Sequence, residues 1–511
     1  MTLADVSPDL SRSTETRLYE RPLGHEISHR NSDNAGVPYF SPDVISNDHF
    51  SIFDEYATNP RFQELQTELR SLLFTEARSA CATRDQTPEP QGDSSKPFQR
   101  HALIAEHLLK NEGPILPAKK VHYLKIWIRE CAPWLDMFDQ ARNFGLRVPV
   151  LAQTSPAVLY ALLALSARQV ERQGGKEMAS RDSLELYSEA ISFLTPSLNA
   201  NQPDVLVTAC ILCVLEMMSV SPRDWRRHLQ GCAALLEASG VNGFSGGLLQ
   251  AVFWCYARMD LCAAIIADGA EGTVLPIKRW VLLDAILPTT QNDSEEQNVI
   301  SRTFLELGQT SPDMHANYAV YLCAKVCNVV AQRVQFLELG VANGCTNEAF
   351  EQAWNGLWTE LQQWLERRPP EMLPVKTVAC SPENNQFPSA LFAHWSAISG
   401  NQLYHTACIL MLETKPDQAD LSEMQTIQSP LWHARQVVGI SLANPHQGCL
   451  NNAIQPLYIA GKLFSHYEEH KLVCDILHRI EAKSGWGSRW RIKDLEIAWG
   501  YPRGTFGQHQ R

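Results

Sequence analysis

The chain has 511 residues, of which 45% are hydrophobic and 20% are charged. This composition is typical of a folded protein and excludes a chain that is disordered throughout. With 44 lysines and arginines against 56 aspartates and glutamates, the formal net charge is -12, so the chain as a whole repels duplex DNA.

Cysteine usage and the apolar windows bear on the compartment. The 14 cysteines lie mostly within apolar helical patterns, which indicates buried thiols in a reducing compartment and not a disulfide framework. The first residues have no basic stretch followed by an apolar run, so they do not predict a secretion signal. The most apolar window, residues 205–220, contains Glu216 and is shorter than the roughly 20 residues of a membrane span. We therefore expect no membrane partner.

The N-terminal region is polar before it becomes helical. Residues 1–47 are rich in polar residues and proline without periodicity, which predicts a disordered lead. Residues 48–97 predict an amphipathic helix, interrupted at Asn59-Pro60, and then a linker rich in proline, glycine and serine. Residues 98–511 are expected to form one all-helical domain.

The stretch from residue 203 to 268 shows the clearest helical periodicity. Three segments with apolar residues at three- and four-residue spacing follow one another, separated by Ser221-Pro222 and by Gly240. We expect Ser221 and Asp224 to cap the second segment. This sequence of helices predicts an all-α multi-helix bundle. The middle helix is our candidate regulatory and core helix, with the residues Trp225, Arg226, His228 and Leu229.

That middle helix has an apolar stripe opposed by arginines. Arg226, Arg227 and His228 are able to contact an acidic partner, but a solvated helix face is the favoured explanation of the arginines. Both interpretations stay open at this point.

The remainder of the chain repeats the helical pattern. Residues 289–297 and the proline-rich residues 369–388 are predicted to be loops, and no segment alternates with the period of a strand. Further helices are predicted within residues 121–172 and over residues 184–194, 317–339, 349–367, 391–412, 431–443, 452–465, 472–483 and 491–499.

Residues 243–247 match the Gly-x-Ser-x-Gly pattern of a hydrolase nucleophile elbow around Ser245. That elbow requires a strand before the serine, whereas here a helical pattern precedes and another follows. The pentapeptide is therefore interpreted as a turn between helices.

Two other patterns resemble metal-ligand spacing. His466 to His470 fit His-x-x-Glu-His, but no third ligand is evident and polar neighbours suggest a solvated helix junction. The pairs Cys210/Cys213 and Cys323/Cys327 lie in apolar helices, where packing in the core is the expected role. We thus predict no catalytic, cofactor-binding or metal-binding residue, with a helical enzyme or metal-dependent hydrolase and a cytosolic helical scaffold as the alternatives.

Several blocks together resemble the fungal-specific transcription factor domain, the helical regulatory region of fungal zinc-cluster regulators. The resemblance covers residues 48 to 500. The blocks are Trp134–Asp139, Val148–Ala152, Ala161–Arg168, Trp225–Cys232, Gln455–Gly461, Ile480-Glu481, Gly485-Trp486, Arg489–Arg491 and Trp499-Gly500.

The resemblance implies a nuclear transcription regulator that is not an enzyme and that controls a metabolic or secondary-metabolite gene set. It also implies three kinds of partner: the transcription machinery or a DNA-binding protein, a second subunit in a homo- or heterodimer, and a small-molecule effector. Members usually carry six cysteines within about thirty residues near the N-terminus; these cysteines bind two zinc ions and position a short helix in the major groove of DNA. In this sequence Cys81 is the only cysteine before Cys131. We therefore expect no direct DNA contact from this chain, and zinc as a cofactor only if such a cluster precedes Met1.

Overall fold

The computed structural model describes residues 56, 58–84, 114–173, 181–194, 203–219, 222–281, 293–380, 387–416 and 428–507. All of them belong to the unit formed by residues 46–511. The lead at 1–47, the boundaries at 47/48 and 97/98, and Ser221 with the side chain of Asp224 lie outside the described residues. The predictions made for them stay predictions.

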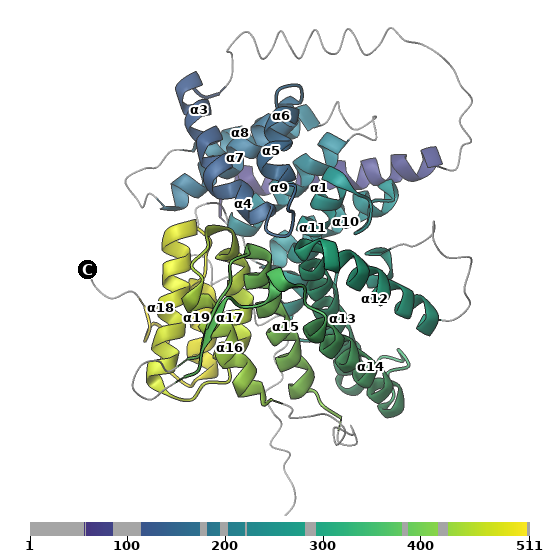
Figure 1. The fold of residues 1–511 in the computed structure, drawn as a ribbon. Coiled ribbons are helices and arrows are strands. Elements are labelled where there is room, and N and C mark those ends of the chain that lie inside the picture. The colour runs from purple at the N-terminus through teal and green to yellow at the C-terminus, as the bar shows by residue number, and fades with distance from the viewer. Residues whose placement is uncertain are drawn as a thin grey trace, which may run out of the picture. The chain divides into compact units, whose positions relative to one another are not determined.

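Most of the described residues are helical, and the only strands among them are two of three residues each, which confirms the all-α fold class (Figure 1). The first part comprises α1 (Pro60–Arg84), α3 (Pro117–Ile126), the π-helix η3 (Trp127–Cys131), α4 (Ala132–Leu135), α5 (Asn143–Leu146), α6 (Val148–Leu151), α7 (Pro156–Gln173), α8 (Asp182–Leu194), α9 (Pro203–Ser219), α10 (Pro222–Ser239) and α11 (Gly247–Ile266). The second part comprises η6 (Ile277–Arg279), α12 (Asp293–Thr310), α13 (Pro312–Glu338), α14 (Asn347–Glu366), η7 (Pro370–Met372), α15 (Trp395–Glu413), α16 (Pro430–Ala443), η8 (Gln447–Cys449), η9 (Asn451–Ala453), α17 (Ile454–Gly461), α18 (Tyr467–Ser484) and α19 (Arg489–Ala498).

The three central helices follow the predicted pattern closely. Pro203 begins α9, and Gly240 follows the end of α10 with a positive φ of 69°, the left-handed conformation that glycine adopts after a helix. Trp225 and Leu229 of α10 are buried, as the apolar stripe predicts. All three helices therefore belong to the core.

Helix α1 starts where an interruption was predicted. The side-chain oxygen of Asn59 accepts hydrogen bonds from the backbone N–H groups of Arg61 (2.9 Å) and Phe62 (3.3 Å), and Pro60 is the first helical residue. Asn59-Pro60 is thus the start signal of a helix, because asparagine satisfies free N–H groups and proline suits the first turn. The helix packs on α10, where Leu73 lies against Gly231.

Two predicted loops contain regular structure. Helix α12 begins at Asp293, inside the predicted loop at 289–297, and Glu295 and Glu296 place negative charge in its first turn, where the helix dipole favours it. Within the proline-rich connection, β1 (Lys376–Val378) pairs antiparallel with β2 (Ser389–Leu391), Thr377 opposite Ala390. Three-residue strands are too short for a period-two pattern to reveal them.

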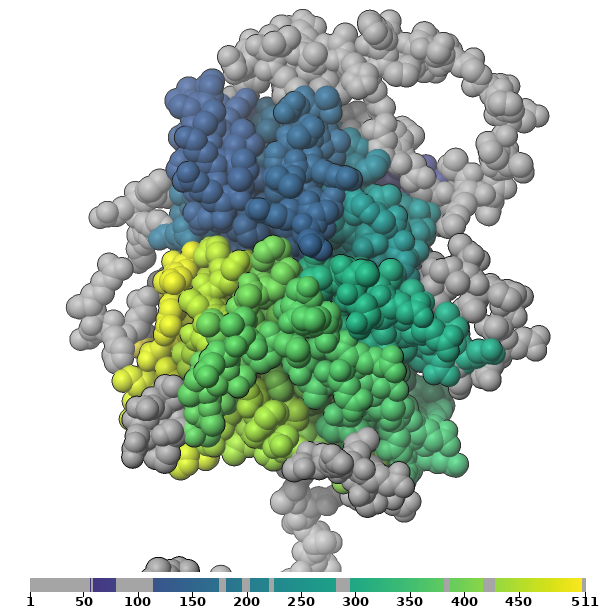
Figure 2. Space-filling model, viewed as in Figure 1, coloured from purple at the N-terminus to yellow at the C-terminus, as the bar shows by residue number. Residues whose placement is uncertain are grey.

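Segments far apart in the sequence share one core. Arg172, near the end of α7, donates from Nε to the carbonyl oxygen of Gly485, and Gln173 donates to the carbonyl oxygen of Lys483. The α18–α19 connection thus closes over the end of α7, and Figure 2 shows the yellow C-terminal surface directly below the blue surface of the early helices.

Helix α11 is, among the described residues, the one helix that is long and apolar enough to cross a membrane by length and composition. However, 72% of its most apolar window is buried inside the protein. Burial of this kind is the environment of a core helix.

A pair of histidines joins α15 to α16. His405 Nδ1 lies 2.9 Å from His433 Nδ1, and both side chains are buried. Burial lowers the pKa of His433 to about 4, and burial together with His433 and Arg368 lowers the pKa of His405 well below its usual range. The pair therefore carries at most a small charge at neutral pH.

We expect this pair to make the protein less stable in acid. Because the folded pKa values lie below the unfolded value of about 6.5, the unfolded chain takes up more protons as the pH falls toward 4. Each histidine then costs up to about 1.4 kcal/mol of stability per pH unit. The melting temperature at pH 7 and pH 5 measures the effect. His433→Gln should flatten the pH dependence, while the same change at exposed His122 should leave it intact; an unchanged slope in His433→Gln would contradict the assignment.

Candidate functional site

The candidate helix α10 presents its predicted residues to different surroundings. Trp225 and Leu229 are buried, as predicted. Arg226 pairs with Glu271 (2.7 Å) and donates to the carbonyl oxygen of Gly272 (2.8 Å), so it fastens α10 to the loop after α11. His228 is only 2% exposed and does not belong to a solvated face. Its suggested role as a surface contact for an acidic partner is therefore wrong.

His228 lies against a carboxylate in the core. Its Nδ1 is 3.0 Å from Oε1 of Glu216, which belongs to α9 and is 1% exposed. Glu216 also accepts hydrogen bonds from the hydroxyl of Tyr187 (2.6 Å) and from Nε2 of Gln66 (2.9 Å). One carboxylate thus connects α1, α8, α9 and α10.

The electrostatics of this cluster favour a charged pair. Burial lowers the pKa of His228, but the Glu216 carboxylate and Cys232 together outweigh burial, and the pKa is raised well above its usual value. The hydrogen bond from the Cys213 thiol and the charge of His228 lower the pKa of Cys232 to about 6 although burial opposes them. Burial raises the pKa of Cys213 well above its usual range. A protonated imidazole next to Glu216 is the arrangement that these shifts support.

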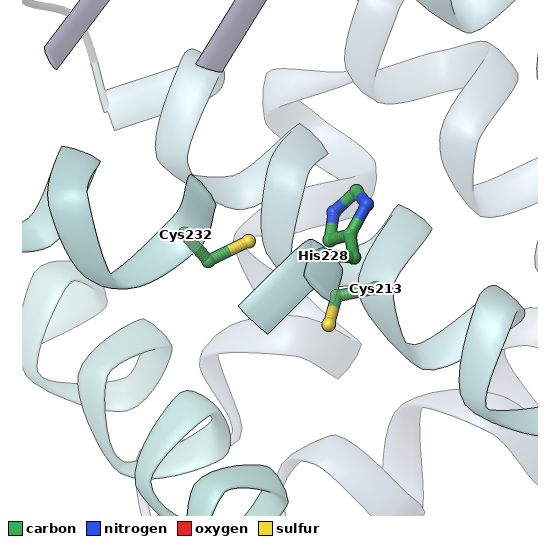
Figure 3. A group of neighbouring side chains, drawn as sticks. All are labelled: Cys213, His228 and Cys232. Carbon is green, nitrogen blue, oxygen red and sulfur yellow. The ribbon is translucent and has the colours of Figure 1, made fainter. Parts of the chain in front are cut away.

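Cys213, His228 and Cys232 are, within the described part of the chain, the one group of three residues that could hold a metal ion. Their ligand atoms lie within 4.8 Å of one another, and Figure 3 shows the Cys232 sulfur turned toward the imidazole. Cysteine and histidine are zinc ligands. The ion pair with Glu216 involves Nδ1 of His228 and leaves Nε2 without a hydrogen-bond partner among the described residues. The expected absence of a metal cofactor stays a prediction.

Beside this cluster, the other faces of α9 and α10 line a cavity of about 200 Å³. Its wall combines helices from both parts of the chain. The lining residues are Trp134, Leu135, Arg172, Val214, Met217, Met218, Trp225, Cys255, Arg258, Met259, Cys262, Ile266, Asn451, Asn452, Ile454, Gln455, Glu481, Trp486, Gly487, Arg489, Trp490 and Lys493.

Aromatic and apolar groups form most of this wall. Trp134 of α4 and Trp486, in the loop before α19, meet edge to face with ring centroids 5.9 Å apart. Burial raises the pKa of Cys262 to about 12, so this thiol adds no charge to the wall. An apolar cavity with a few polar groups is the usual form of a small-molecule site.

The residues of the two catalytic motifs lie in different surroundings. Residues 243–247 connect α10 to α11, as predicted, and the exposed Ser245 accepts a hydrogen bond from the N–H of Asn242 (2.9 Å). His466 is exposed at the start of α18, whereas His470 is buried. Both ring nitrogens of His470 are used, at 3.2 Å from the hydroxyl of Tyr501 and 2.9 Å from the carbonyl oxygen of Phe464.

Sequence reasoning missed Glu216 and the cavity. A single charged residue within an apolar helix is a signal that could have identified Glu216, since such a charge needs a partner. The cavity had no comparable signal, although Trp134, Trp225 and Trp486 all lie in the sequence blocks that carry the family resemblance.

Comparison with known protein families identifies the family of this chain. The family model described as the fungal specific transcription factor domain matches residues 122–499, which include every element around the cavity, and every element of the Glu216 cluster except α1. The chain belongs to this family. The match confirms the resemblance inferred from the sequence blocks.

One curated protein is similar to this chain. The transcription activator AMTR1 of Alternaria alternata is 24% identical to it over 479 residues. The alignment covers 72% of this chain and 61% of the relative, so the chain spans less than two thirds of that protein's length. No solved structure matches the chain significantly.

Proposed function

We propose that this chain is a nuclear, non-enzymatic regulator of transcription that controls a metabolic or secondary-metabolite gene set and is switched by a small molecule in the cavity. The observation that carries the proposal is the family match over residues 122–499. The similarity to a transcription activator supports the same role.

The charge of the chain bears on how it reaches a promoter. The net charge of -12 disfavours direct binding of the chain as a whole to DNA. Residues 1–130 contain one cysteine, Cys81, and so do not supply a six-cysteine zinc cluster. The proposal is that the chain reaches a promoter through a zinc cluster that precedes Met1 or through a DNA-binding partner, forms homo- or heterodimers, and engages the transcription machinery from there.

The cavity supports the effector part of the proposal. It lies where α4 and α9–α11 meet α17–α19, so a bound molecule contacts segments from both parts of the chain. A ligand that binds better to one packing of these helices shifts the population toward it.

The test is a reporter assay in a fungal host, with the chain fused to an unrelated DNA-binding domain. The fusion should change reporter expression relative to the DNA-binding domain alone, and Leu229→Asp, which places a charge in the core, should abolish the effect. Ser245→Ala and His466→Ala should keep it, since loss of function in either would favour the enzyme alternative. An unchanged reporter with full-length fusion protein in the nucleus, or exclusion of the tagged chain from the nucleus, would contradict the proposal.

A further inference from the structure

We infer that the cavity binds a small aromatic carboxylate. This inference rests on the proposed function, because it names the chemical class of the effector.

The size restricts the ligand to about one ring. The cavity measures about 200 Å³, and an apolar cavity of about 150 Å³ in another protein accommodates benzene. A single aromatic ring with one small substituent fills this space.

The wall favours an aromatic body over an aliphatic one. Trp134, Trp225 and Trp486 present indole rings, and Met217 and Met259 present thioethers. Rings pack on other rings edge to face or offset, and thioether sulfur contacts ring edges favourably. A flat ring therefore gains more from this wall than an alkyl chain of the same volume.

The charge of the wall favours an anion. The lining contains three arginines and Lys493 but a single carboxylate, Glu481, a formal excess of three positive charges. Glu481 is already paired with Arg489 at 3.1 Å, and Arg258 donates to the carbonyl oxygen of Leu135 at 2.7 Å. Lys493, by contrast, has no hydrogen bond or ion pair with any described residue. It is the cation best placed to take a ligand's carboxylate.

The unused polar groups are all donors. Within the described part of the chain, no acceptor is bonded to Nε1 of Trp134, Nε1 of Trp486 or Nδ2 of Asn452, although these atoms are closed to solvent. A buried donor without an acceptor costs free energy. Because no water-sized molecule reaches these nitrogens, a ligand with acceptor oxygens relieves part of this cost only when the side chains turn toward the cavity, whereas a cationic ligand relieves none of it.

The experiment compares benzoate with benzamide, which has the same shape but no charge, by calorimetry on the purified full chain. We expect benzoate to bind about tenfold more tightly, the factor that one charge-assisted hydrogen bond supplies. Lys493→Gln should lower benzoate binding by about tenfold and leave benzamide unchanged. Lys483→Gln, the same change on the exposed surface of α18, should alter neither.

Three outcomes would overturn the inference: no binding of benzoate at millimolar concentration to folded protein, equal binding of both probes, or a Lys493→Gln variant that binds benzoate as tightly as the original chain. The reporter assay separates this failure from failure of the proposed function. If the reporter responds but benzoate does not bind, the proposed role as a regulator stands and the ligand class is wrong. If benzoate binds but the reporter does not respond, the ligand class stands and the proposed role is wrong.

Discussion

Replacing Glu216 by leucine is expected to destabilise the protein by about 3 to 5 kcal/mol, because it removes one partner of a buried ion pair. His228 then loses its carboxylate partner, and Tyr187 and Gln66 lose the acceptor of their hydrogen bonds. The melting temperature of the purified variant measures the loss.

Two controls make this prediction specific. Glu271→Gln removes the partner of Arg226 at a site where Glu271 is 58% exposed, and exposed pairs contribute about 1 kcal/mol or less. The double variant Glu216→Leu with His228→Leu should be less destabilised than the sum of the single variants, since removing both charges together leaves neither unpaired. Additive losses would show that the two side chains do not act as a pair.

Replacing Gly439 by alanine is expected to cost about 3 kcal/mol or more, at the upper end of overpacking effects. A Cβ on Gly439 would lie 1.8 Å from the carbonyl oxygen of Pro388, a backbone atom that cannot rotate away. The same contact area holds β2 on α16, where Asn444 accepts from the N–H of Phe392 (2.9 Å) and donates to the carbonyl oxygen of Ala390 (2.7 Å). The substitution therefore forces the strand pair away from the helix.

Gly356 is the matched control for this change. It lies on the exposed face of α14, and a Cβ there meets nothing within 4 Å. Alanine at this position should stabilise the protein by about 0.5 to 1 kcal/mol, because alanine has the higher helix propensity. Thermal unfolding of both variants gives the comparison, and a similar melting temperature for the two would contradict the steric argument.

The sequence alone was sufficient to predict structural features that depend only on residues adjacent in the chain. The start of α9 at Pro203, the glycine that follows α10 and the turn around Ser245 all follow from local chemistry, namely proline in a first turn and glycine after a last one. The family could be inferred for a related reason, since its blocks are contiguous stretches of chain.

The candidate site depends on contacts that no local pattern contains. Glu216 was visible as a charge in an apolar helix, but its partners come from α1, α8 and α10. His228 was considered, together with two arginines, as a contact for an acidic partner, yet one residue turns a helix by about 100°, which is enough to bury it. The meeting of Trp134 with Trp486 requires the whole chain between them to fold.

The hydrogen bond from Gln173 to the carbonyl oxygen of Lys483 spans 310 residues. A ribosome adds about 5 to 20 residues per second, so roughly 15 to 60 s pass between the synthesis of the two partners. Throughout that time the end of α7 lacks its cover and the cavity lacks its α18–α19 wall. The nascent chain therefore exposes tryptophan-rich surface to chaperones for most of its synthesis, and ligand binding can begin only after translation of α19.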